Sequence, residues 1–170
     1  MPRRTIRGDK RELARRAVRT IQDFAGTLHA ARCIMVVAIR KTDDPKMRHA
    51  ARYALQIAEG AILLTMRKFE DLWSTHISEL IPEKAERPER GTALIAECKK
   101  RSLRDTADRL IAHYGKRGEG PLSPGEIEQL IRRNRWQTSE ELVAWVGPVI
   151  QAMTEIRDAI MDRYGIASLD

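Results

Sequence analysis

The chain has 170 residues, of which 42% are hydrophobic and 32% are charged, and its formal net charge is +7. This length suits one domain, and this composition argues against a disordered chain and against a chain built from membrane spans. The longest apolar stretch, residues 30–39, is shorter than the roughly 20 residues that a bilayer requires. The basic N-terminus is not followed by the apolar core of a secretory signal, so we expect a soluble, cytoplasmic protein.

Most of the positive charge lies at the N-terminus. Residues 1–19 hold eight basic and two acidic residues, a net charge of +6, whereas the other 151 residues carry +1. We expect residues 1–8 to form a flexible basic arm and residues 9–170 to form a single helical domain. Nucleic acid is the polyanion that such a segment would bind, and the candidate contacts are Arg3, Arg4, Arg7, Arg11, Arg15 and Arg19. A solvated tail that keeps the protein soluble is the alternative.

The spacing of apolar residues predicts helices throughout and no strands. Leu13, Ala17 and Ile21 begin a stripe that continues to Ile39, which predicts a long amphipathic helix starting near Asp9. Further helices are expected over residues 45–73, 92–114, 123–134 and 138–164, with a mobile loop at 115–121 and a kink at Gly147-Pro148. The sequence therefore predicts an all-α, up-and-down bundle of about five helices, two or three of them long.

The sequence contains no motif for binding a metal or a cofactor. The four histidines lie in separate segments, and no pair has the spacing of metal ligands. Cys33 and Cys98 lie 65 positions apart in apolar-periodic segments, so we expect both to be buried thiols. The glycines at 115–120 follow a helix and lack the lysine of a phosphate-binding loop. We expect neither a metal nor a cofactor.

One segment combines acid, base and cation positions on a helix. Asp105, Arg109 and His113 repeat at i, i+4 and i+8 beside the apolar stripe that includes Leu103 and Ala107. His113 falls in the last turn before Gly115. A helix-end histidine that bonds a backbone carbonyl, next to an ordinary surface Asp–Arg pair, is the alternative to a catalytic role.

The same segment carries a resemblance to a known family. Ile111-Ala112-His113-Tyr114-Gly115, near the end of a long helix and followed by Pro121-Leu122-Ser123-Pro124-Gly125-Glu126-Ile127, resembles the HEPN superfamily, particularly its abortive-infection-type members. The stretch at 62–71, an apolar run followed by an arginine and acidic residues, is similar to the second-helix pattern of those proteins. The resemblance covers roughly residues 45–131.

The resemblance implies a dimeric, RNA-associated helical protein of a prokaryotic defence or toxin–antitoxin system. In that family an arginine, four to six intervening residues and a histidine form a metal-independent ribonuclease site at the dimer interface. His113 matches the histidine, but the three arginine positions hold Asp108, Ala107 and Thr106. Arg109 is too close by one residue and Arg104 too far by two, and these two are the candidates for the missing cation.

Three functions therefore stay open. In a metal-independent ribonuclease, His113 would be the base for the 2'-hydroxyl, and Arg109 or Arg104 would stabilise the developing negative charge. A non-catalytic HEPN-like module would use the groove around these same residues to bind a protein or a nucleotide. A helical nucleic-acid-binding protein would act through the basic N-terminal segment alone.

Overall fold

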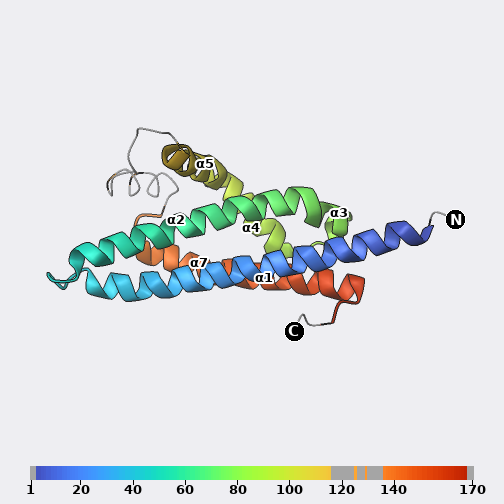
Figure 1. Cartoon of the computed structure of the whole chain (residues 1–170), viewed down its shortest axis with the longest axis horizontal. Coiled ribbons are helices and arrows are strands. Elements are labelled where there is room, and N and C mark those ends of the chain that lie inside the picture. The colour runs from blue at the N-terminus through green and yellow to red at the C-terminus, as the bar shows by residue number, and fades with distance from the viewer. Residues whose placement is uncertain (1–2, 116–124, 126–128, 130–135, 168–170) are drawn as a thin grey trace.

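A computed structural model of the chain describes residues 3–115, 125, 129 and 136–167 (Figure 1). The regular elements of this part of the chain are all helices, which confirms the predicted all-α bundle. Three of them are long: α1 (Arg3–Lys41), α2 (Arg48–Leu72) and α7 (Ser139–Tyr164). Figure 1 shows α1 and α2 as a hairpin in the foreground, with α7 behind them and packed along α1.

The core lies where the apolar stripes of these three helices meet. Ile21, Leu28 and Met35 lie seven residues, or about two turns, apart on α1 and are fully buried, as the three-and-four spacing of the whole stripe predicts. Ile62, Met66 and Phe69 of α2 and Leu142, Val149, Met153 and Ile156 of α7 complete the same cluster. Since burying one such side chain contributes about 1.5–3 kcal/mol, packing of this stripe holds the long helices together.

The first helix begins earlier than its sequence signals suggested. We expected a helix start at Asp9, but α1 already begins at Arg3 and so includes residues assigned to a flexible arm. Pro2 precedes Arg3 in the sequence, and proline is favoured at helix starts because its fixed φ suits the first turn. Arginine is also a good helix former and occupies three of the positions 3–8, which offsets the lower propensities of Thr5, Ile6 and Gly8.

The predicted helix over residues 92–114 is in fact two helices. These are α4 (Glu89–Lys100) and α5 (Leu103–Gly115), and Ser102 between them has a φ of +53°. This left-handed residue ends α4 in the usual C-terminal manner, and its carbonyl then accepts a hydrogen bond from the Thr106 N–H at the start of α5. The apolar spacing did contain the signal, because Cys98 and Leu103 are five positions apart rather than three or four.

The segment between α2 and α4 reverses the chain. α2 continues through a π-helical turn (Trp73–Ile77) into α3 (Ser78–Leu80), and a 3₁₀ turn (Lys84–Glu86) precedes α4. Gly91 in α4 is buried at the point where α4 meets α7, and a Cβ there would lie 2.6 Å from Ile156 Cδ1. Only glycine allows α4 and α7 to approach this closely.

The last helix starts and ends as its sequence suggests. The Thr138 hydroxyl accepts a hydrogen bond from the Glu141 N–H at 3.2 Å, which confirms the predicted N-cap. Pro148 lies inside the helix. Gly165 ends α7 with a φ of +58°. The predicted helix at 123–134 is helical at its two described positions, 125 and 129, and the rest of it, like the predicted loop after Gly115, lies outside the described residues.

Candidate nucleic-acid interface

A basic hollow lies where the first half of α1 meets the chain that follows α7. It has a volume of about 410 Å³, and its walls are Arg11, Glu12, Arg15, Arg16 and Arg19 on one side and residues 165–167 on the other. The four arginines are exposed, whereas Ala14, Ala17 and Val18 between them are buried in the core. The amphipathic pattern of α1 therefore aligns the guanidinium groups on the solvent side of the helix.

One carboxylate faces these four cations. Glu12 accepts a hydrogen bond from Arg16 Nε at 3.2 Å and lies 4.0 Å from Arg15 Nη1. Arg11 Nη2 donates to the backbone carbonyl of Gly165 at 3.0 Å, and no carboxylate of the described residues forms an ion pair with it. Among the described residues that line the hollow, four guanidinium groups and one carboxylate give a net charge of +3. Like charges at i, i+4 cost a helix stability, and a bound polyanion would remove that cost.

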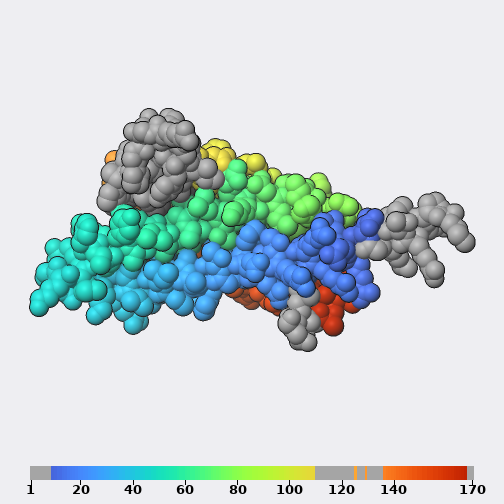
Figure 2. All heavy atoms as spheres, viewed as in Figure 1, coloured from blue at the N-terminus to red at the C-terminus, as the bar shows by residue number. Residues whose placement is uncertain are grey.

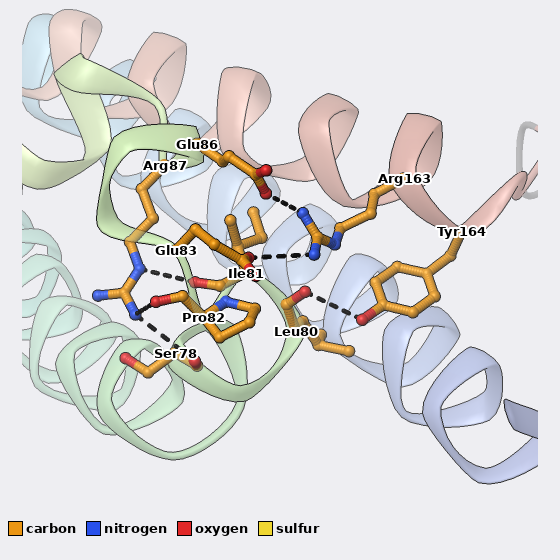
Figure 3. A network of polar contacts seen from close by, with 9 residues as sticks. All are labelled: Ser78, Leu80, Ile81, Pro82, Glu83, Glu86, Arg87, Arg163 and Tyr164. Carbon is orange, nitrogen blue, oxygen red and sulfur yellow. Dashed lines mark hydrogen bonds and ion pairs between the residues drawn. The ribbon is translucent and has the colours of Figure 1, made fainter. Parts of the chain in front are cut away.

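The second wall of the hollow is held by the end of α7 (Figure 3). Arg163 forms ion pairs with Glu83 at 3.1 Å and with Glu86, and the Tyr164 hydroxyl donates to the Leu80 carbonyl at 2.9 Å. A hydrogen bond from its own backbone, helped by Arg163, keeps the pKa of Glu83 below its usual range, so this carboxylate is charged. These contacts hold the end of α7 against residues 80–86, and the hydrogen bond from Arg11 to Gly165 joins the next residue to α1.

The predicted nucleic-acid contacts divide into two groups. Arg11, Arg15 and Arg19 line the hollow together, as their spacing of four residues suggested. Arg3, Arg4 and Arg7 belong to α1, but their side chains lie outside the described part of the chain. Sequence reasoning missed Arg16, although its position next to Arg15 was a visible signal. It also missed the contribution of residues 165–167, which come from the other end of the chain.

The second predicted site, on α5, is tied to α2 by ion pairs. Arg104 Nη1 lies 3.1 Å from Asp71 Oδ1, and Arg67 Nη1 lies 3.5 Å from the other oxygen of Asp71. Arg67 also pairs with Asp108 through its Nε. The network joins the two helices and engages Arg104 in a structural contact. It also gives Asp108, at one of the family's arginine positions, a structural partner.

The structure does not bring the two candidate arginines together. Arg109 is exposed and forms no ion pair with a described residue. It lies five residues after Arg104, which places it about 140° around the helix from the network with α2. His113 is in the last turn of α5, but its side chain lies outside the described residues, so its role stays a prediction.

A buried carboxylate lies next to this network. Glu70 of α2 is only 8% exposed, and its Oε1 has no hydrogen-bond partner. Burial raises the pKa of Glu70, and the nearby charges of Arg104 and Lys99 oppose that shift. Burial, followed by the charge of Glu70, also raises the pKa of the Cys98 thiol.

The two cysteines differ in exposure. Cys98 is buried, as predicted. Cys33 was predicted to be buried but is exposed on α1, because it lies on the opposite side of the helix from the core positions Leu28, Ala31 and Met35.

Other classes of site find no support in the described residues. Across residues 3–115 and 136–167, no three His, Cys, Asp or Glu side chains gather as metal ligands would. Within the same ranges, none of the helices has the length and apolar character that crossing a membrane demands. No protein-family model, curated protein or solved structure matches this chain.

Proposed function

We propose that this chain binds nucleic acid, and RNA in particular, through the basic hollow of α1, called the arginine hollow below. The observation that carries the proposal is the set of four exposed arginines that line a single hollow, of which only Arg15 and Arg16 pair with a described carboxylate, that of Glu12. Guanidinium groups bind phosphate oxygens through paired hydrogen bonds, and the net charge of +3 supplies the attraction. The described residues that line the hollow include no aromatic side chain, so the contacts are to phosphates and carry little sequence preference.

The experiment measures binding of a labelled single-stranded RNA by fluorescence anisotropy at fixed salt. Arg15→Gln combined with Arg19→Gln should weaken binding about tenfold or more, because two phosphate contacts are lost. The matched control is Arg40→Gln combined with Arg52→Gln, which removes two exposed arginines near the α1–α2 turn. Equal losses in both variants would mean that net charge alone attracts the RNA, and the hollow would then not be its binding site.

A second candidate function is RNA cleavage by a HEPN-like site on α5. It rests on the resemblance around His113 and on the exposure of Arg109, which has no acidic partner among the described residues and lies in the same helix as His113. His113 would act as the base and Arg109 as the cation. The ion pair with Asp71 makes Arg104 the weaker choice for that cation.

Cleavage is tested with a labelled RNA in the presence of a metal chelator. His113→Ala and Arg109→Gln should each abolish the activity, whereas Arg104→Gln should retain it. RNA that stays intact with the unmodified protein, or cleavage that survives in His113→Ala, would remove this candidate. The binding proposal would stand in either case, because the two sites lie on different helices.

A further inference from the structure

The outer face of the α1–α2 hairpin is uncovered and apolar. The described large hydrophobic side chains that are exposed all belong to α1, α2 or the turn between them. Val37, Tyr53 and Ile57 are 62%, 61% and 59% exposed, and Ile34 is 45% exposed. In Figure 1 this hairpin forms the foreground, and in Figure 2 no other described helix covers the middle of it.

These four side chains form one patch. Each of them directly precedes a buried or half-buried residue: Met35, Ala38 and Ala58 are buried, and Ala54, which follows Tyr53, is half-buried. On both helices they therefore lie on the same rotational side of the core stripe. Because the two helices run antiparallel, the same rotational side leads to the same face of the hairpin. The two pairs also lie at similar distances from the turn at 42–47.

The face is almost free of charge. Residues 24–39 contain one charged residue, Arg32, and residues 53–66 contain one, Glu59. Glu59 is buried and accepts a hydrogen bond from the Ser139 hydroxyl at 2.9 Å, so it contributes nothing to the outer face. A helix on the surface of a protein that is 32% charged normally carries charges on its solvent side. The lack of them here is typical of a surface that another molecule covers.

We infer that the outer α1–α2 face is the contact surface between two copies of this chain. A neutral face meets its own copy without like-charge repulsion, whereas nucleic acid would need more cations than Arg32. Gly26 and Gly60 are on α1 and α2 within this region, and a Cβ at either position would meet nothing, so both backbones are open to close approach. Two such hairpins related by a two-fold axis would form a four-helix layer.

The area of the outer α1–α2 face is large enough for a contact with a second copy of the chain. Sixteen residues of helix span about 24 Å, and two neighbouring helices are about 20 Å wide, which gives a footprint of about 480 Å² on each copy. Two copies then bury about 960 Å², close to the roughly 1,000 Å² that a specific interface needs. The inference goes beyond RNA binding and does not depend on it, because the arginine hollow lies nearer the N-terminal end of α1.

The test is sedimentation velocity of the full chain over a range of concentrations. The unmodified protein should sediment at twice the chain mass of 19.4 kDa. Ile34→Lys combined with Ile57→Lys should sediment as a monomer, because four lysines would meet in the apolar interface. The control is Ala144→Lys combined with Gln151→Lys, which adds two lysines at exposed positions of α7 and should remain a dimer.

Melting temperature supplies a second measurement that needs no variant. A dimer melts at a higher temperature when the protein is more concentrated, whereas a monomer does not. A monomeric unmodified protein at 100 μM would overturn the inference, and so would a dimer that survives the two isoleucine substitutions. Binding of the unmodified protein to vesicles of anionic lipid, without dimer formation, would assign the face to a membrane and overturn the inference as well.

Discussion

Replacing Glu70 by glutamine should stabilise the protein. Glu70 is buried between α2 and the α4–α5 region, its Oε1 has no partner, and its raised pKa shows that burial outweighs the attraction of Arg104 and Lys99. Glutamine keeps the size of the side chain and removes the charge. A buried polar group without a partner costs about 1–3 kcal/mol and a charged one costs more, so the neutral amide carries the smaller penalty, and losing the attraction to the two cations offsets part of that gain. We expect a net gain of about 1 kcal/mol at pH 8, or a rise of about 2–4 °C in melting temperature.

The stabilisation by Glu70→Gln should depend on pH. When folding raises the pKa of a carboxyl group, the folded state binds its proton more tightly than the unfolded state does. The contribution to stability is therefore complete below the ordinary glutamate pKa of 4.5 and is lost as the pH rises through the higher folded value. The advantage of Glu70→Gln should be small at pH 4 and should grow with pH.

The assay is urea denaturation of both proteins at pH 4, 6 and 8, followed by circular dichroism. Glu59→Gln is the matched control, because Glu59 is equally buried in α2 but is hydrogen-bonded to Ser139. That variant should lose stability at pH 8. If Glu70→Gln were less stable than the unmodified protein at pH 8, the carboxylate would be a favourable charge, and the reasoning from burial would be refuted.

Three further predictions test the packing. Gly91→Ala should lower the free energy of unfolding by about 1–3 kcal/mol, because the new Cβ would lie 2.6 and 2.7 Å from two atoms of the buried Ile156. Urea denaturation measures this change, and unchanged stability would show that α4 and α7 separate freely. Thr138→Ala should cost about 1 kcal/mol in the same measurement through loss of the N-cap of α7, and Thr138→Ser should restore it. A thiol reagent should modify Cys33 at once and Cys98 only on unfolding, because Cys98 is buried and its pKa is raised; rapid reaction of both thiols would contradict this burial.

Helix content and the main core could be predicted because they follow from periodicity. The stripe of α1 is regular over about eight turns, so Ile21, Leu28 and Met35 are buried as expected. The break between α4 and α5 was missed because the residue that makes it, Ser102, is not glycine, so the five-residue gap between Cys98 and Leu103 was the signal that the sequence offered. The early start of α1 was missed because the acidic signal at Asp9 resembles a cap.

The candidate site was predictable only where its residues are neighbours in sequence. Arg11, Arg15 and Arg19 share a helix face, so their spacing predicted one surface. Residues 165–167 reach the same hollow from the far end of the chain, and only the packing of α7 on α1 brings them there. The partners of Arg104 and Asp108 also come from another helix, α2, so their ion pairs depend on tertiary structure rather than on spacing within α5.

The salt dependence of RNA binding tests the central claim most directly. If three or four arginines of the hollow contact phosphates, the logarithm of the binding constant should fall with the logarithm of salt concentration with a slope of about −2 to −3 for single-stranded RNA. Any contacts from Arg3, Arg4 or Arg7 would make it steeper. Arg15→Gln combined with Arg19→Gln should reduce the steepness by about 1.4, because two phosphate contacts are lost. An identical slope in the variant and the unmodified protein would contradict an RNA site at the α1 arginine hollow.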